Sequence, residues 1–132
     1  MKLPEPCLEQ FFLLLDALKQ CRSLREFSGA LVSLKDISLL LWALQGITDL
    51  NGKRTAPSAG GKYPLKVYLI STRVSDLDQG ILKYDCHKHA LTKILNEERC
   101  AAVADAAIGE QDWIKGSAAI NSVGWSDQPA LV

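Results

Sequence analysis

The chain has 132 residues, and its fifteen basic side chains balance fifteen acidic ones, so its formal net charge is +0. Apolar residues make up 48% and charged residues 23%, which is the composition of a globular domain and excludes a disordered segment. A balanced charge argues against a nucleic-acid partner, and the apolar runs at residues 11–15 and 39–44 are too short to cross a membrane. Because no export signal precedes Asp16, we expect a cytoplasmic protein with reduced cysteines.

The N-terminal third predicts two helices. Leucine and phenylalanine recur at helical spacing between residues 7 and 21, and the width of this apolar stripe predicts burial on two sides, in the core or at a subunit interface. Ser33 and Asp36 form a capping pair for a second helix, which Gly46 terminates. The predicted buried face of that helix contains Leu34, Ile37, Leu40, Leu41 and Leu44.

The remaining elements predict a sheet. A loop over residues 47–63 precedes a strand at residues 65–72, where apolar and polar side chains alternate. Residues 81–85 and 89–95 predict a hairpin that is closed at residues 86–88. Asn96 caps a third helix that ends at Gly109, and residues 118–123 predict one more short strand. Together these helices and strands belong to a single domain over residues 1–132.

Two segments carry the residue types of a phosphate or cofactor site. The first, at the end of the first helix, places two guanidinium groups and a hydroxyl within four residues, although arginines at a helix end also simply complement the helix dipole. Its residues are Arg22, Ser23 and Arg25. In the second segment, small residues let a flat ligand approach the backbone, and two glycines permit a positive φ. Taken by itself, this segment is also consistent with an ordinary loop. Its residues are Pro57, Ser58, Ala59, Gly60 and Gly61.

The order of these motifs resembles the FMN-dependent nitroreductase superfamily, and specifically its SagB-type dehydrogenase branch. Three segments carry most of the resemblance: CRSLREF at residues 21–27, LLWALQG at residues 40–46 and RTAPSAGGKYPL at residues 54–65. The hairpin LKYDCHKHAL at residues 82–91 and the QDW at residues 111–113 add to it.

The resemblance implies a nitroreductase-like α+β fold, with an antiparallel-rich sheet flanked by helices, that works as an intertwined homodimer. FMN is then held in two interface sites, with Ser23 and Arg25 at the phosphate and ribityl chain and Arg22 as a weaker candidate. The residues of the loop from Pro57 to Gly61 lie along the isoalloxazine ring. The implied reaction is a two-electron hydride transfer through flavin N5, with no catalytic side chain assigned.

The substrate class that the resemblance implies depends on the branch. SagB-type enzymes oxidise azolines in peptides to azoles, whereas other branches reduce nitroaromatics or quinones with NAD(P)H. Two departures from the family pattern stand out: Cys21 takes the place of its first arginine, and the chain ends where the family's C-terminal part begins. We therefore expect a domain truncated at its C-terminus. The alternative function is a flavin-free protein–protein interaction module without turnover.

Other residue groups have simpler interpretations. Cys86, His87 and His89 lie in the predicted hairpin turn, but structural zinc needs four ligands, so no metal site is predicted. His89 is expected to pair across the hairpin with Tyr84. Trp42 is expected in the core, and Trp113 fits either a packing anchor or the mouth of the site.

The loop also carries basic side chains on both sides of its glycines: Lys53, Arg54 and Lys62. They would meet the phosphates of a nicotinamide cofactor or, as the favoured interpretation, are solvated loop charges.

Overall fold

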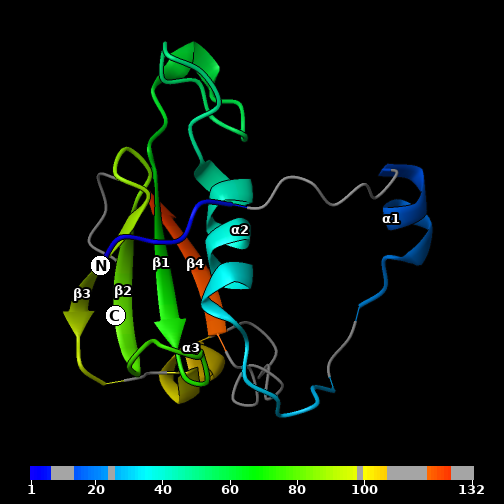
Figure 1. Ribbon diagram of the computed structural model, residues 1–132, viewed down its shortest axis with the longest axis vertical. Coiled ribbons are helices and arrows are strands. Elements are labelled where there is room, and N and C mark those ends of the chain that lie inside the picture. The colour runs from blue at the N-terminus through cyan, green and yellow to red at the C-terminus, as the bar shows by residue number, and fades with distance from the viewer. Residues whose placement is uncertain (7–13, 24–25, 98–99, 107–118, 126–132) are drawn as a thin grey trace.

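The computed structural model of the chain describes residues 1–6, 14–23, 26–97, 100–106 and 119–125 (Figure 1). Its strands form one antiparallel sheet in the order β3-β2-β1-β4, with helix α2 packed along one face. The helices are α1 (Leu14–Gln20), α2 (Leu34–Gln45) and α3 (Cys100–Ala106), with a short 3-10 turn at Ala59–Gly61. The strands are β1 (Leu65–Ser71), β2 (Gly80–Asp85), β3 (Ala90–Leu95) and β4 (Ala119–Trp125). The predicted α+β class and antiparallel sheet are confirmed.

The sheet is built outward from β1, which lies between β2 and β4. The β1–β2 pairing places Tyr68 opposite Lys83, and β4 runs along the full length of β1, from Leu65 opposite Trp125 to Ser71 opposite Ala119. Strands β2 and β3 form the predicted hairpin, with a register shift next to Ile81. The last predicted strand therefore exists, and it pairs with the first one.

The core lies between α2 and the inner face of the sheet. Leu41 of α2 and Leu69 of β1 are both completely buried. The other buried members of this cluster are Leu3, Ile37, Val67, Val74, Leu82, Tyr84 and Leu91. Each large apolar side chain buried in this way stabilises the fold by about 1.5–3 kcal/mol.

Helix α2 begins as the sequence predicts. The Ser33 hydroxyl oxygen accepts the Asp36 backbone N–H at 3.1 Å, and the hydroxyl donates to the Asp36 carboxylate at 2.6 Å. At the other end Gly46 follows the helix in extended backbone, not in the left-handed conformation of a common glycine cap. Glycine is needed there because a Cβ at this position would collide with the Trp42 ring and carbonyl.

The buried face of α2 differs from the predicted one at Leu40, and it also includes two polar residues, Ser38 and Gln45. Leu40, predicted to be buried, is 50% exposed, whereas Ser38 is completely buried. The reason is the N-terminal segment, which covers Ser38: the hydroxyl of Ser38 donates to the Pro4 carbonyl at 2.5 Å. A polar side chain therefore takes a core position because its hydrogen bond is satisfied.

The N-terminal segment is attached to the start of β3. Leu3 N–H donates to the His89 carbonyl at 2.9 Å, and Leu91 N–H donates to the Met1 carbonyl at 2.8 Å. The His89 Nε2 lies 2.8 Å from the Ser38 hydroxyl and 3.0 Å from the Pro4 carbonyl, and its Nδ1 lies 2.9 Å from the Tyr84 hydroxyl. A neutral imidazole with its proton on Nε2 satisfies all these contacts when Tyr84 donates to Nδ1.

The expected cross-strand pair of Tyr84 and His89 is therefore a real contact, but it is not a pair of opposed strand residues. Tyr84 lies opposite Leu91 in the ladder, and His89 precedes β3 with a φ of 45°. The two rings meet edge to face, with centroids 5.7 Å apart.

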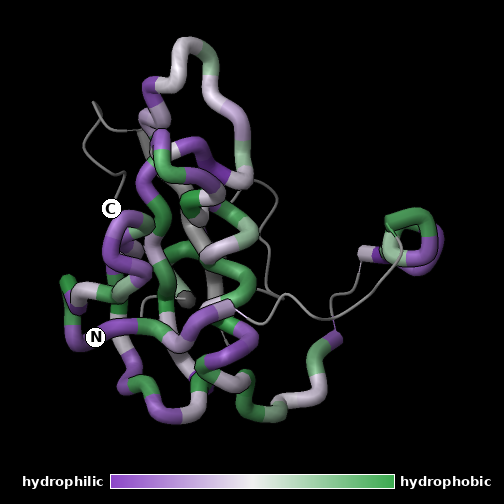
Figure 2. The backbone as a smooth tube through the Cα atoms, turned by 45° about the horizontal axis from the view of Figure 1, so that its top comes forward, coloured by the Kyte–Doolittle hydropathy of each residue, from purple (hydrophilic) through white to green (hydrophobic). Residues whose placement is uncertain are grey.

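Helix α1 lies apart from the sheet and α2 (Figure 1), and none of its side chains is buried. Its apolar residues stand clear of the apolar region around α2 (Figure 2). The apolar stripe of the first helix is therefore not buried in the core of its own chain, and that prediction is wrong for the described residues 14–20. Its burial at a subunit interface stays a prediction. Residues 7–13 of the predicted helix lie outside the described residues, as do Gly109 and Trp113. None of the described helices is long and apolar enough to span a membrane.

Replacement of Tyr84 by Phe should change how stability depends on pH. Burial raises the pKa of Tyr84 from 10.0 to about 12, with smaller contributions from Cys86 and Asp85. The folded chain then retains a proton that the unfolded chain releases above pH 10, so the free energy of unfolding falls as the pH rises through this window. Urea denaturation at a series of alkaline pH values should show a steeper fall for the wild type than for Tyr84→Phe. Parallel curves would contradict this, and Tyr68→Phe is the control.

Candidate functional site

The loop between α2 and β1 first forms a small turn that returns to the end of α2. Ile47 and Arg54 form an antiparallel bridge, and the Asp49 carboxylate accepts the backbone N–H groups of Asn51 and Lys53 at 3.0 and 2.8 Å. The hydrogen bond from Lys53 is the main reason that the pKa of Asp49 lies below its usual range. This turn brings Arg54 back beside Gln45, the last residue of α2.

Arg54 connects three parts of the chain. Its Nη1 donates to Gln45 Oε1 at 3.1 Å, its guanidinium carbon lies 4.5 Å from the centroid of the Tyr63 ring, and its backbone N–H donates to the Tyr63 hydroxyl at 3.3 Å. Arg54 is half-buried, whereas Lys53 and Lys62 are exposed. The interpretation as a solvated loop charge is therefore wrong for Arg54, which joins α2, the loop and the start of β1.

The loop from Pro57 to Gly61 has the backbone conformation that its glycines predict. Gly60 and Gly61 have φ values of 63° and 64°, and the Gly61 N–H donates to the Ser58 carbonyl at 3.0 Å. The Ser58 hydroxyl oxygen accepts the Tyr63 N–H at 3.0 Å. A Cβ added at Gly61 would meet no atom within 4 Å, so the backbone there is open to a ligand.

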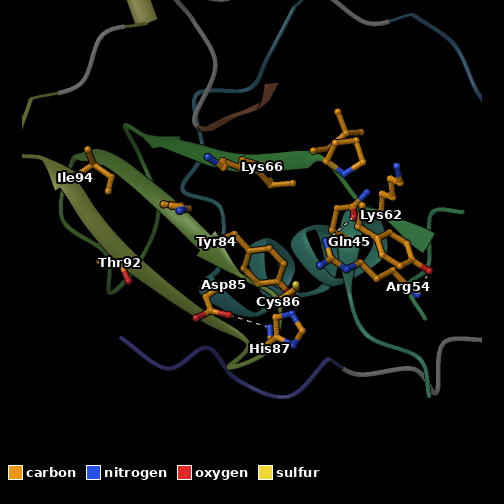
Figure 3. A pocket seen from close by; sticks show the side chains of 15 residues that line it. Gln45, Arg54, Lys62, Lys66, Tyr84, Asp85, Cys86, His87, Thr92 and Ile94 are labelled. Carbon is orange, nitrogen blue, oxygen red and sulfur yellow. Dashed lines mark hydrogen bonds between the residues drawn. The ribbon is translucent and has the colours of Figure 1, made fainter. Parts of the chain in front are cut away.

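Two cavities border the segment that leads into β1. The smaller, of about 510 Å³, is lined by Pro57, Ser58 and Ala59 of the predicted loop. The larger, of about 600 Å³, is lined by residues of β1, β2 and β3 (Figure 3). Both cavities share a wall that consists of Gln45, Lys62, Tyr63, Pro64 and Leu65.

The predicted phosphate-binding segment lies elsewhere in the chain. Arg22 Nη1 donates to the carbonyls of Lys19 and Cys21 at 3.0 and 2.7 Å, so this arginine caps the end of α1. Ser23 is exposed, and Arg25 lies outside the described residues. Because α1 lies apart from the sheet, the structure does not bring Arg22 and Ser23 to the 57–61 loop of the same chain (Figure 1).

The remaining chemical groups are separate from one another. In the part of the chain that the structure describes, no three His, Cys, Asp or Glu side chains gather as metal ligands. Cys21 and Cys86 are free thiols. Trp42 is expected in the core, but its side chain is only half-buried.

Sequence reasoning missed two residues of the shared wall. Gln45 and Tyr63 stand in the segments at residues 40–46 and 54–65, but nothing in their spacing shows that Arg54 joins them.

Comparison with known proteins identifies the family. Residues 18–129 match the profile of the nitroreductase family. The chain belongs to the nitroreductase family. It is 38% identical over 93 residues to a curated protein of Methanocaldococcus jannaschii that is named as a nitroreductase, a match that covers 70% of this chain and 47% of that protein. The chain thus spans about half the length of this relative.

Solved structures of proteins named as nitroreductases have the same fold. One from Ralstonia eutropha JMP134 has 35% identity and a TM-score of 0.61, covering 70% of this chain and 41% of that one. One from Anabaena variabilis has 26% identity and a TM-score of 0.56, covering 68% of this chain and 20% of that one. The nitroreductase-like fold is therefore confirmed, and these matches do not distinguish the SagB-type branch.

In this nitroreductase-family chain, Arg54→Lys should destabilise the loop next to β1. Lysine has neither the planar group that stacks on Tyr63 nor the fork that reaches Gln45, so a loss of about 1–2 kcal/mol is expected. Urea denaturation measures the loss, and limited proteolysis between residues 47 and 63 should become faster. Lys53→Gln, an exposed neighbour, is the control and should change stability by less than about 0.5 kcal/mol. A fully stable Arg54→Lys variant would show that these contacts do not hold the loop.

Proposed function

We propose that the chain is an FMN-dependent oxidoreductase. The observation that carries this proposal is the open glycine loop at residues 57–61, beside a cavity of about 510 Å³, in a chain of the nitroreductase family. Gly60 and Gly61 have no side chain, and a Cβ at Gly61 would meet no atom within 4 Å, so the loop backbone is open there. A flat ring system can approach such a surface closely.

The loop residues fit the isoalloxazine ring. The oxygen of the Ser58 hydroxyl is engaged by the Tyr63 N–H, so its own proton remains free to donate to a polar edge of the ring. Pro57 and Ala59 line the same cavity and offer apolar contact. Tyr63, which follows the loop, is held in place by the Arg54 guanidinium over its ring.

We propose that the phosphate end of FMN is held by the helix exit, with Ser23 and Arg25 as its main partners. Arg22 is the weaker candidate, because one of its nitrogens already donates to two carbonyls at the end of α1. Cys21, where the family has an arginine, is exposed and contributes no charge.

A homodimer would combine these two parts of the site. Within one chain α1 lies apart from the loop, and its leucines are exposed, with Leu15 at 77%. A second copy can bury these leucines and present its own 57–61 loop to the helix exit. Each FMN would then lie between Ser23 and Arg25 of one copy and the loop of the other.

Bound FMN supplies two-electron chemistry at its N5 atom, and the protein contributes binding, orientation and electrostatics. The hairpin motif at residues 82–91 favours the SagB-type reaction on a peptide, the oxidation of an azoline to an azole. NAD(P)H is the proposed electron donor if the reaction instead runs toward reduction of a small molecule. A cytoplasmic location fits both the free thiols and this donor. Family membership does not favour the flavin-free interaction module.

Gly61→Ala should weaken FMN binding more than it weakens the fold. Gly52→Ala is a matched control, since both glycines have positive φ and open space at the Cβ position. Each variant should lose about 1 kcal/mol of stability from backbone strain. Only Gly61→Ala should raise the FMN dissociation constant, by about tenfold or more, because its methyl group lies against the ring. Retained flavin absorbance and fluorescence quenching measure binding; equal affinities for both variants, or no binding by the wild type, would contradict the proposal.

Heterodimers of two binding-deficient variants should recover flavin. When Arg25→Ala and Gly61→Glu chains are co-expressed with different tags and purified through both, one interface site of each heterodimer contains two intact halves. We expect a single FMN in each heterodimer and almost none in either homodimer. If each site used one chain alone, the heterodimers would stay colourless.

A further inference from the structure

The larger cavity, of about 600 Å³, is separate in its lining from the 57–61 loop (Figure 3). Lys83 of β2 and Thr92 of β3 are directly opposite each other in the ladder, and with Ile94 they line one side of the cavity. Arg54 and Lys62 line it from the loop before β1. Cations from two distant parts of the sequence thus border one space.

The charge around this cavity is strongly unbalanced. Among the described residues, the ammonium groups of Lys62 and Lys83 form no hydrogen bond or ion pair. The only carboxylate in the described lining is Asp85, and its Oδ1 accepts the N–H groups of His87 and Lys88 at 2.9 and 3.2 Å. Since the whole chain has a formal net charge of +0, this local excess of cations is not a consequence of composition. Positive charges that border the same cavity repel one another and attract an anion.

Arg54 provides a second, independent observation. Its Nη1 donates to Gln45, but its Nε is buried and has no hydrogen-bond partner in the described structure. A buried donor without a partner destabilises a protein by about 1–3 kcal/mol, so such groups usually have a ligand or water to bind. This guanidinium therefore has an unused donor, and Arg54 is one of the residues that line the cavity.

The rest of the lining is partly apolar: besides the polar or charged side chains of Gln45, Lys66 and His87, it contains apolar and aromatic residues. Val67, Leu65 and Pro64 lie at the β1 side, and the Tyr63 ring adds a flat surface. An inorganic ion would leave this apolar surface in water, whereas an anionic group attached to a flat apolar body would cover both parts.

We propose that this cavity binds a small organic anion, a phosphate or carboxylate attached to a flat apolar body. Lys62, Lys83 and Arg54 hold the anionic group, and the β1 side of the lining holds the body. The proposal does not depend on FMN binding, although the two cavities share the wall at Tyr63.

The test uses the flavin-free full chain and isothermal titration at low ionic strength. Phenyl phosphate and benzoate should both bind, the neutral benzamide should not, and inorganic phosphate should bind more weakly than phenyl phosphate. Added salt should weaken binding, because the contacts are electrostatic and partly exposed. Binding of benzamide as tightly as benzoate, or no binding of either anion, would overturn the proposal.

Charge-removing variants locate the site. The double substitution Lys62→Gln with Lys83→Gln should weaken phenyl phosphate binding about tenfold, because two nearby charges are lost. Lys35→Gln, an exposed lysine on α2 outside the cavity, is the matched control and should bind as the wild type does. Equal binding by the double variant and the control would place the anion elsewhere and overturn the proposal.

A competition experiment separates this site from the flavin site. If the chain saturated with FMN still binds phenyl phosphate, the two sites are distinct, as proposed. If FMN displaces phenyl phosphate competitively, the cavity holds the flavin itself and the proposal is wrong. If FMN does not bind at all while phenyl phosphate does, the anion site stands and the proposed flavin function fails.

Discussion

The contact of the Arg54 guanidinium with the Tyr63 ring joins two parts of the chain between α2 and β1. The Arg54 guanidinium also donates a hydrogen bond to Gln45 at the end of α2. One side chain therefore contacts both the end of the helix and the segment that leads into β1. A cation–π contact contributes about 0.5–2 kcal/mol, less than one or two buried leucines. The fold as a whole therefore depends on the sheet and α2, whereas Arg54 contacts Gln45 and Tyr63 in the wall that both cavities share.

Local signals predicted most of the secondary structure. The capping pair at Ser33, the alternation in β1 and the hairpin of β2 and β3 depend on residues close in sequence, so their short-range chemistry was enough to predict them. Leu40 is wrongly predicted to be buried, and the burial of Ser38 is not predicted, because Ser38 is covered by Pro4, which lies 34 residues away. A helical stripe shows which residues are apolar, but it does not show which segment of the chain will cover a serine.

The same distinction applies to the candidate site. The left-handed conformations of Gly60 and Gly61 followed from residue type, because only glycine reaches that region without strain. The role of Arg54 did not, since its partners at Gln45 and Tyr63 are each nine residues away and become neighbours only when the 47–54 turn closes. The net charge of the chain likewise does not predict the charge around a single cavity. A chain with balanced charges still gathers cations around one cavity, because the sum over a sequence contains nothing about where strands place them.

The shared wall has a consequence for how the two cavities behave together. Tyr63 has a positive φ of 43°, a conformation that a bulky residue keeps only when its surroundings hold it there. Three contacts do so: the Ser58 hydroxyl at its N–H, the Arg54 N–H at its hydroxyl, and the guanidinium over its ring. A ligand on either side that strengthens these contacts stabilises the wall for the other side, and by thermodynamic linkage the effect on binding must be mutual. The loop that faces the smaller cavity and Arg54, which lines the larger one, are therefore parts of one structural unit, with Tyr63 at its centre.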